Sequence, residues 1–559
     1  MPALPALLPH DREEACLSFH FSPFRRPAIG SVPLSLATAT YLLFVPNRTF
    51  WEKGLTYLGD QKLALLVLAI GLAAAFAALC VAVSVKYLTK PLFIAIILVS
   101  AAASWFTDRF GVIIDLEMIR NAAETTSAEA GNLITPAFLL HMVLYGLLPS
   151  LLIVWVRIAH HDFPRKFVRN VAVIVPMLAV FAMAGLSHAS IYASVTREHR
   201  DWFDTLNPII PLVNAALYVS ASQNERDIVA APLGTDARVA ETSTTSRKPR
   251  VTILVVGETA RAANFSLGGY ARETTPELQA RDIVYFSDTS SCGTATAVSL
   301  PCMFSDLTRA TYSHAKGLAR ENLVDVLGHA GVKVEWWDND TGSKRVASRI
   351  GERKFFGLND PEHCEDGECR DTVMLNELDG WLDSVKGDSV LVLHQIGSHG
   401  PAYYKRYPEA YRRFVPDCRS AEFSQCSREE IVNAYDNTIA YTDHVVATVI
   451  DQLAARQDRI DPAMIYVSDH GESLGEYGLY LHGAPYMIAP PEQTHVPFLL
   501  WLGDEAKASL DPACLAAEAA RPQSHDNFFH TVLGLMQVET KELRSDLDLV
   551  GACRRMAGA

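Results

Sequence analysis

Five uncharged, apolar stretches occupy most of the first 200 residues of the chain. They cover residues 28–46, 63–85, 91–106, 134–156 and 171–195. A helix needs about 20 apolar residues to cross a bilayer, and the second stretch matches that length most clearly. Pro33 interrupts the first stretch, and the third is short. Buried core helices would give similar runs, but five in succession favour a membrane domain with five spans over residues 1–195.

From residue 251 onward the apolar positions follow a different pattern. Continuous apolar runs, typical of buried strands, cover residues 251–257, 332–337, 389–397, 463–471 and 496–503. Helical periodicity separates these runs, most clearly over residues 428–453. The alternation predicts a second domain, residues 251–559, with an α/β fold around a mainly parallel sheet.

The residues between these two domains are amphipathic and then polar. Residues 197–220 mix aromatic, apolar and charged side chains, which favours a helix on the membrane surface, although an ordinary connector fits as well. Residues 230–250 are polar and rich in Ser and Thr, as linkers are. We therefore assign residues 196–250 to an interfacial helix and a linker.

Basic residues indicate on which side of the membrane the second domain lies. With the N-terminus inside, nine Lys and Arg residues fall in cytoplasmic segments and five in the short external loops. Cytoplasmic loops of membrane proteins carry an excess of these residues. With five spans, this modest bias places everything after residue 195 outside the cytoplasm.

Eight of the ten cysteines lie beyond residue 290 and form four close pairs along the chain. The pairs are Cys292/Cys302, Cys364/Cys369, Cys418/Cys426 and Cys514/Cys553. An even set in close pairs suits disulfides in an oxidising compartment, whereas reduced thiols in a cytosolic domain would explain the pairing poorly. Spacing does not prove the pairing, but the lack of a CxxC motif disfavours metal binding. We expect Cys16 and Cys80 to stay free.

Side chains that could bind a metal follow several of the predicted strands. They are Glu258 after the first strand, His399 after the third, Asp469 and His470 after the fourth, and His482 twelve residues later. Ligands gather at the carboxyl ends of strands in such sheets. Each residue alone is more often structural, because Asp-His pairs cap turns and single histidines pack in cores. Their recurrence favours a site for a divalent ion such as zinc.

The segment SSCGTATAVSLPC, residues 290–302, offers a hydroxyl for chemistry near such a metal. A threonine hydroxyl has too high a pKa to attack unaided, so it needs a base or a metal. A helix starting after Gly293 would also direct N–H groups toward an anion, and a Cys292–Cys302 disulfide would hold the loop. These arguments do not choose between Thr294 and Thr296.

Five motifs follow the apolar stretches in a fixed order: GETARAANFSLGGY, SSCGTATAVSLPCMFS, IGSHGP, NAYDNTIAYTDHV and SDHGESLGEYGLYLHGAP. Together they resemble the bacterial phosphoethanolamine transferases, the family of lipid A modifiers that includes mobile polymyxin-resistance enzymes. The resemblance covers nearly the whole chain. It implies an alkaline phosphatase/sulfatase-like fold for the second domain, and it implies that the second threonine of CGTAT, Thr296, is the nucleophile.

The resemblance also implies the remaining site residues. Glu258, Asp469 and His470 would bind a catalytic zinc ion with Thr296 as the fourth ligand, and His399 and His482 would serve the substrate phosphate or a second zinc. Lys344 would contact a phosphate. Asp340 is left out of this set because some family members have Asn there.

One external loop carries further expected substrate contacts. Asn121, Thr125 and Glu129 recur every four residues in the loop between the third and fourth spans, so they would share one helical face. Similar residues in the family approach the ethanolamine head group. A plain polar face on an interfacial helix explains the spacing equally well.

The implied reaction moves phosphoethanolamine from phosphatidylethanolamine to lipid A through a covalent intermediate on Thr296. The added ammonium group would lower the negative charge of the envelope and weaken binding of cationic peptides such as polymyxin. The acceptor could instead be the lipopolysaccharide core or a periplasmic glucan. A sulfatase- or phosphatase-like hydrolase, a glycerol-phosphate transferase and a non-catalytic lipid-binding sensor share parts of the pattern. The complete ligand set disfavours the sensor.

Composition agrees with this interpretation. The chain has 559 residues and is 49% hydrophobic, so it is long enough for two domains and too apolar for a purely soluble enzyme. The net charge of −14 argues against nucleic acid as a partner. We expect a monomeric, multi-pass protein of the bacterial inner membrane with its C-terminal catalytic domain in the periplasm.

Overall fold

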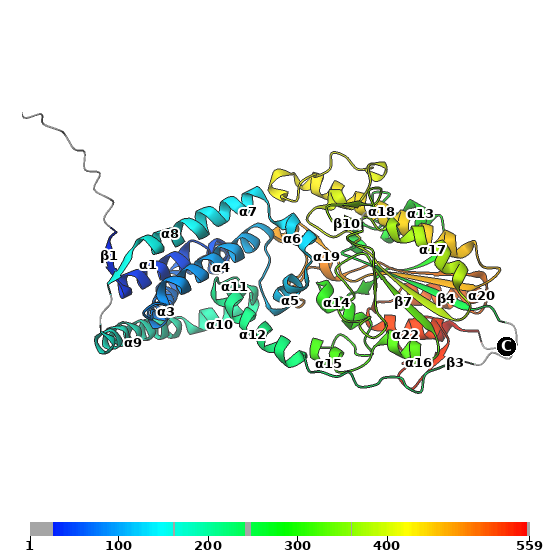
Figure 1. Ribbon diagram of the computed structural model, residues 1–559, viewed down its shortest axis with the longest axis horizontal. Helices are drawn as coiled ribbons and strands as arrows, with labels where there is room; N and C mark the ends of the chain where they lie inside the picture. Colours follow the sequence, from blue (N-terminus) through cyan, green and yellow to red (C-terminus); the bar gives the residue numbers. More distant parts are fainter. Residues whose placement is uncertain (1–25, 160–161, 241–246, 359, 556–559) are drawn as a thin grey trace, which may run out of the picture.

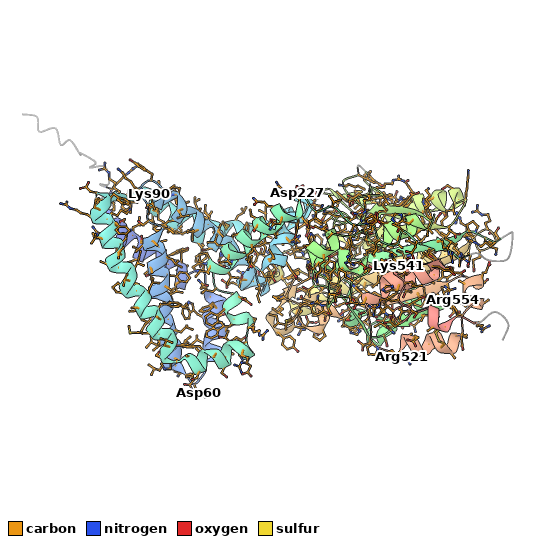
Figure 2. The ribbon with its side chains drawn as sticks, turned by 90° about the horizontal axis from the view of Figure 1, so that it is seen from below. Asp60, Lys90, Asp227, Arg521, Lys541 and Arg554 are labelled. Carbon is orange, nitrogen blue, oxygen red and sulfur yellow. A yellow bond between two sulfur atoms is a disulfide. The ribbon has the colours of Figure 1, made fainter. Side chains whose placement is uncertain are left out.

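The computed structural model describes residues 26–159, 162–240, 247–358 and 360–555. A helical part and an α/β part lie at opposite ends of the molecule, with α5 and α6 between them (Figure 1). Figure 2 shows Asp60 and Lys90 at opposite ends of the helical part, and Arg521 and Arg554 on the α/β part. Apart from α5 and α6, the helices of the first 200 residues therefore lie away from the sheet that follows.

The helical part consists of helices and two short strands that pair in parallel, one before α1 and one after α8. Its elements are β1 Ala28–Gly30, α1 Ser31–Phe44, α2 Arg48–Tyr57, α3 Lys62–Ala82, α4 Thr89–Phe110, α5 Leu116–Glu124, α6 Ser127–Leu133, α7 Pro136–His141, η1 Met142–Leu147, α8 Leu148–Trp155, β2 Arg157–Ala159, α9 Phe163–Ser187, α10 Ala189–Glu198, α11 Asp201–Asp204 and α12 Ile209–Glu225. Strand β1 pairs with β2. Helix α3 packs against α1 and α9.

Four helical segments in the described part of the chain are long and apolar enough to cross a membrane. They are Lys62–Ala82, Thr89–Phe110, Pro136–Trp155 and Phe163–Ser187. The first predicted span forms only α1, which has 14 residues and measures about 21 Å at 1.5 Å per residue. That length is below the roughly 30 Å of a bilayer core, so the five-span count stays a prediction.

The helix predicted over residues 197–220 is not continuous. Helix α10 ends at Glu198, the short α11 follows, and α12 begins at Ile209 after Pro208. The break at Asn207 has a clear cause, because its backbone N–H donates to Asn47 Oδ1 at 2.8 Å and Pro208 has no N–H to continue a helix. The last apolar stretch is also divided, at His188, between α9 and α10.

The α/β part is built on a seven-stranded mixed sheet in the order β5-β15-β12-β4-β11-β7-β8. The strands are β4 Arg250–Gly257, β5 Ile283–Phe286, β7 Lys333–Asp338, β8 Arg353–Lys354, β11 Ser389–His394, β12 Asp461–Ser468 and β15 Phe498–Leu502. Strand β15 runs antiparallel to β12 and β5, and the remaining neighbouring pairs are parallel. All five predicted strands form; the edge strands β5 and β8 were not predicted.

Both faces of the sheet are covered by helices, which explains the continuous apolar strands. Val251, Ile253 and Val255 of β4 pack with α17 Thr372–Ser384 and α18 Arg428–Ala454. Leu254 and Val256 pack on the other face with α16 Leu323–His329 and α22 Asp526–Leu535. Figure 1 shows the two helix layers on either side of the strands. A strand buried on both faces has no polar side to alternate with its apolar one.

Shorter elements complete the α/β part. They are β3 Arg238–Val239, α13 Pro276–Gln279, β6 Thr289–Ser290, α14 Thr296–Met303, α15 His314–Leu318, β9 Cys364–Glu365, β10 Glu368–Cys369, β13 Ser473–Leu474, β14 Tyr480–Leu481, α19 Pro491–Thr494, α20 Asp504–Ala508, α21 Pro512–Ala519, β16 Gln523–Ser524 and β17 Val538–Glu539. Strand β3 belongs to the expected linker and pairs with β17, so this part of the linker is fixed against the α/β part.

Candidate active site

Four predicted site residues converge at the carboxyl ends of two neighbouring parallel strands. Glu258 directly follows β4, Asp469 and His470 directly follow β12, and Thr296 begins α14. The Thr296 hydroxyl donates to Glu258 Oε2 at 3.0 Å and lies 3.3 Å from His470 Nε2. His470 Nε2 is also 3.4 Å from Glu258 Oε1 and 3.4 Å from Asp469 Oδ2. The sheet therefore gathers the predicted ligands into one buried cluster.

The chemistry and spacing of this cluster fit a divalent cation. Glu258, Asp469 and His470 each offer one ligand atom, and these atoms lie within 4.8 Å of one another. Two ligands bound tetrahedrally to zinc at 2.0–2.2 Å lie about 3.3–3.6 Å apart, close to the contacts above. Glu258 Oε1 and Asp469 Oδ2 are buried without a hydrogen-bond partner in the described chain. Buried carboxylate oxygens are rarely left in that state unless something else satisfies them.

Neighbouring groups orient the remaining atoms of these side chains. Asp469 Oδ1 accepts the backbone N–H groups of Thr259 at 3.3 Å and His470 at 2.7 Å, which leaves Oδ2 free. His470 Nδ1 donates to the Gly471 carbonyl at 2.9 Å, which leaves the Nε2 lone pair facing the cluster. Such outer contacts fix the tautomer and direction of a metal-binding histidine.

Burial shapes the ionisation of the cluster. It raises the pKa of Glu258 well above its usual value, and the nearby Asp469 and Asp340 carboxylates add to the rise. It also lowers the pKa of His470 well below its usual value. The neutral imidazole is the form that binds a metal, and a bound cation would favour the ionised Glu258 carboxylate.

The loop before Thr296 is held rigidly, and only one of its two threonines faces the cluster. The Thr294 hydroxyl donates to the Ala484 carbonyl at 2.7 Å, whereas the Thr296 hydroxyl points at Glu258. Ser299 Oγ donates to the Asp469 carbonyl and ties α14 to the end of β12. A Cβ at Gly293 would lie 3.0 Å from the Ser299 amide nitrogen, so the loop packs too closely there for a side chain.

The four expected disulfides are present. Cys292–Cys302, Cys364–Cys369, Cys418–Cys426 and Cys514–Cys553 are bonded. Cys80 is buried and free, as expected, and Cys16 lies outside the described residues. The first disulfide joins the loop before Thr296 to the last turn of α14, across a sequence separation of 10 residues, so it closes this segment into a small ring.

Removing that disulfide tests its role. We expect the double substitution Cys292→Ser/Cys302→Ser to destabilise the protein by about 3 kcal/mol, the loop-closure entropy of so short a ring. The unfolding midpoint of the detergent-solubilised protein, followed by circular dichroism, should fall by several degrees. The same change at Cys514 and Cys553, far along the chain from Thr296, is the control for activity. Equal loss of activity in both double variants would contradict a role for the ring in holding Thr296.

His399 and His482 extend the cluster toward the helical part. The His482 ring lies 4.4 Å from the His470 ring and 5.4 Å from the His399 ring. His399 Nε2 forms a 3.1 Å ion pair with Glu129 of α6; His399 is buried and Glu129 is partly buried. Burial lowers the pKa of His399, but the Glu129 carboxylate outweighs this effect and raises it to about 9. This contact links the active-site cluster directly to a helix that precedes the α/β part.

The strand end that carries His399 is anchored by a buried aspartate. Asp371 accepts the backbone N–H groups of Ile396 at 2.9 Å and Gly397 at 3.0 Å. Gly397 has a φ of +50°, and a Cβ there would lie 2.6 Å from the Glu258 carbonyl oxygen. The IGSHGP motif therefore needs its glycine to bring His399 beside the Glu258 loop.

The single helical face expected for Asn121, Thr125 and Glu129 does not form. Helix α5 ends at Glu124, Thr125 is extended with φ −64° and ψ 139°, and Thr126 starts α6 by accepting the Glu129 N–H at 3.3 Å. The Thr125 hydroxyl donates to the Asn121 carbonyl at 2.9 Å. The capping preference of threonine overrides the four-residue spacing. Of these three residues, Glu129 is the one placed against a predicted site residue.

Lys344 lies near the same junction. Its side chain is buried, and its Nζ donates to the Thr341 carbonyl at 3.2 Å and lies 3.8 Å from Glu124 of α5. The structure therefore places Lys344, a residue of the α/β part, next to α5, the helix that contains Asn121.

Three residues in or beside the cluster were not assigned from the sequence. Asp340 and His394 form a second group with Glu258 whose ligand atoms lie within 4.8 Å of one another. Glu472 accepts from His482 Nδ1 at 3.1 Å and holds its ring. His394 is the last residue of the buried strand β11. A polar residue at the end of an apolar run is the feature of the sequence that could have identified it. Glu472 follows His470 by two residues in the sequence, but its contact with His482 is formed only in the folded protein.

Comparison with known proteins agrees with this geometry. The sulfatase family model matches residues 250–538, which contain the whole cluster, and the α/β part is thus a sulfatase-like domain. The family model described as "Phosphoethanolamine transferase EptA/EptB" matches residues 72–222. The fold class predicted for the second domain is therefore confirmed.

Individual relatives match over nearly the whole chain. Phosphoethanolamine transferase EptA of Escherichia coli (strain K12) is 38% identical, over 95% of this chain and 99% of its own. Phosphatidylethanolamine transferase Mcr-1 of Escherichia coli is 35% identical, over 94% and 98%. The structure of the integral membrane protein lipooligosaccharide phosphoethanolamine transferase A from Neisseria meningitidis superposes with a TM-score of 0.91, at 36% identity, over 95% of this chain and 100% of that one. The chain belongs to the phosphoethanolamine transferase family.

Proposed function

We propose that this protein transfers phosphoethanolamine from phosphatidylethanolamine to lipid A through a covalent intermediate on Thr296. The observation that carries the proposal is the position of the Thr296 hydroxyl, 3.0 Å from Glu258 and 3.3 Å from His470 in a buried ligand cluster. A hydroxyl inside a metal-binding cluster, at the start of a helix, has the surroundings that a nucleophile needs. Transferase function is also what the relatives' names describe.

In the first step, the Thr296 oxygen would attack the phosphorus of phosphatidylethanolamine. The bond from phosphorus to the diacylglycerol oxygen would break, and diacylglycerol would leave with a proton. Glu258 Oε2 already accepts the hydrogen of the Thr296 hydroxyl; it would take this proton as the new bond forms and pass it to the departing diacylglycerol oxygen. In the second step, a phosphate or sugar oxygen of the acceptor would bond to phosphorus, the bond from phosphorus to the Thr296 oxygen would break, and the proton of the acceptor would return to the Thr296 hydroxyl.

The residues present fit a zinc ion held by Glu258, Thr296, Asp469 and His470. Bound zinc supplies positive charge that lowers the pKa of a hydroxyl and offsets the charge of a phosphoryl group. The first turn of α14 directs backbone N–H groups toward the same space, where they would hydrogen-bond phosphoryl oxygens. His399 and His482 lie next to the cluster and would contact the substrate phosphate.

Both substrates are lipids, so the helical part would position them as well as anchor the enzyme. We propose that Asn121, Thr125, Glu129 and Lys344 contact the head group, since α5, α6 and Lys344 meet at the junction of the two parts. The four apolar helices and the similarity to an integral membrane protein support placement in the bacterial inner membrane. The four disulfides support a periplasmic α/β domain.

The test is to follow both products separately. Purified full-length protein is given labelled phosphatidylethanolamine and lipid A in detergent, and modified lipid A is measured by mass spectrometry alongside diacylglycerol. Equal amounts of the two products are expected. Diacylglycerol accompanied by free phosphoethanolamine would identify a hydrolase, and modified core sugar or glucan in place of lipid A would change the acceptor.

The ion pair between His399 and Glu129 gives a separate prediction for lipid substrates. Glu129→Gln removes the carboxylate that faces the buried His399, so the α6 junction loses a charged contact. We expect kcat/KM for lipid transfer to fall at least about tenfold, or about 1.4 kcal/mol, while cleavage of a small activated phosphodiester changes little. Glu117→Gln, the same change at an exposed position on α5, is the control. A parallel loss with both substrates would contradict a positioning role for Glu129.

A further inference from the structure

A second group of possible metal ligands lies on the other side of Glu258 from Asp469 and His470. In the sheet, β4 lies between β12 on one side and β11 on the other, with β7 beyond β11. His394 is the last residue of β11, and Asp340 lies two residues after the end of β7. One ligand atom from each of Glu258, Asp340 and His394 lies within 4.8 Å of the other two. The carboxyl ends of three adjacent parallel strands therefore meet at this group.

The His394 ring is oriented so that one nitrogen is bound and the other is left over. His394 Nδ1 donates to Asp338 Oδ2 at 2.8 Å, and Asp338 Oδ2 is itself held by Trp336 Nε1 at 3.0 Å. His394 Nε2 has no hydrogen-bond partner in the part of the chain that the structure describes. The His394 side chain is completely buried. A carboxylate on one ring nitrogen and a free second nitrogen is the usual arrangement of a metal-binding histidine.

The distances fit a shared cation better than a hydrogen bond. His394 Nε2 and Asp340 Oδ2 are 3.8 Å apart, which is too long for a hydrogen bond. Two ligands of one zinc ion lie about 3.3–3.6 Å apart, so a small inward movement would place both on a cation. Asp340 and Glu258 are 5% and 0% exposed. A cation between these two buried carboxylates and the unpartnered His394 nitrogen would offset their negative charge.

One member of the group, Asp340, borders a cavity. Asp340 lines a cavity of about 460 Å³, together with Asn339, Thr341, Glu129 and His399. This cavity touches the junction with α6, where the head group is proposed to bind. Of the three proposed ligands, Asp340 is the one that borders this cavity.

We propose that Glu258, Asp340 and His394 form a second divalent-cation site, with the Glu258 carboxylate shared between the two sites. Nitrogen and carboxylate oxygen donors without a thiolate suit zinc or manganese. Three protein ligands leave a position open for water or a phosphoryl oxygen, as in catalytic metal sites. This second-site proposal depends on the proposed function only through Glu258, because Asp340 and His394 take no part in the first cluster.

The test measures zinc binding rather than activity. Full-length protein in detergent is stripped with chelator, titrated with zinc against a competing indicator, and its metal content determined by elemental analysis. Wild type should bind two equivalents. Asp340→Asn keeps the shape of the side chain and should bind one, with the second equivalent weakened at least a hundredfold; His394→Gln should do the same. Asp366→Asn removes an exposed carboxylate from the same cavity and should still bind two equivalents.

A variant of the first cluster distinguishes a failure of the second-site proposal from a failure of the proposed function. His470→Gln should lose the first zinc equivalent and still bind zinc at Asp340 and His394. A loss of zinc seen in this variant but not in Asp340→Asn or His394→Gln would therefore report on the proposed catalytic cluster and not on the second site. Anomalous diffraction at the zinc edge from zinc-soaked crystals should give a peak beside His394 Nε2. One equivalent in wild type, or two in Asp340→Asn, would overturn the second site whatever the outcome for His470→Gln.

Discussion

Replacing Thr296 with alanine should abolish phosphoethanolamine transfer and leave the protein folded. The substitution removes the hydroxyl that faces Glu258 and His470 at the start of α14. We expect a loss of at least about a thousandfold in kcat, equivalent to about 4 kcal/mol of transition-state stabilisation. The measurement is lipid A modification from labelled phosphatidylethanolamine, with circular dichroism to check the fold.

Thr294→Ala is the matched control for this experiment. It removes a hydroxyl of the same type two residues away, which donates to the Ala484 carbonyl instead of facing the cluster. Its effect should be limited to the stability of the loop, about 1 kcal/mol for a lost hydrogen bond. Incubation with labelled donor alone should leave label on a peptide containing Thr296 in wild type and none in Thr296→Ala. Transfer at the wild-type rate by Thr296→Ala would refute the assignment of the nucleophile.

Removing His470 should have a similarly large effect through loss of the metal. His470→Gln deletes the imidazole whose Nε2 lies 3.3–3.4 Å from Thr296, Glu258 and Asp469. We expect transfer to fall at least about a thousandfold and the zinc content of the purified protein to fall by one equivalent. Chelation of the wild type should produce the same loss, and added zinc should restore activity to the wild type only.

His530→Gln is the corresponding control. His530 is a buried histidine on α22 whose Nδ1 accepts the Arg544 N–H at 3.2 Å, far along the chain from any predicted ligand. Its replacement should cost stability but leave the zinc content unchanged. If His470→Gln retained full zinc and activity, or if manganese alone supported turnover of the wild type, zinc would have to be abandoned as the catalytic ion.

The helical part shows how far apolar patterning alone can predict structure. Four of the five expected spans appear as helices of 20 residues or more. In a bilayer, the backbone N–H and C=O groups of a single apolar segment can all be hydrogen-bonded within that segment only if it forms a helix. The interruption at Asn207 was not predictable, since it depends on a contact with Asn47, 160 residues away. The same limit applies to Thr125 and Thr126, where local capping divided a segment that spacing alone described as one face.

The α/β part shows the same difference between elements that local patterns predict and elements that depend on distant contacts. The five central strands were predicted because each is buried on both faces and therefore continuously apolar. The edge strands β5 and β8 carry weaker patterns, and their pairing depends on β15 and β7 being in place. Sequence motifs and the resemblance singled out Glu258, Thr296, Asp469 and His470 as candidate site residues, and the order of the strands in the sheet brings them within contact distance.

What the sequence by itself determined is the membrane-plus-α/β organisation, the family and the first ligand cluster, because each depends on local patterns or on motifs that stand next to strand ends. Tertiary structure alone decided the partners that join distant segments. His399 meets Glu129 across about 270 residues of chain, and Asp340 and His394 meet Glu258 only because β7, β11 and β4 are neighbours in the sheet. Sequence spacing carries no information about such contacts, since they are set by which strands pair and which loops the disulfides and hydrogen bonds hold together.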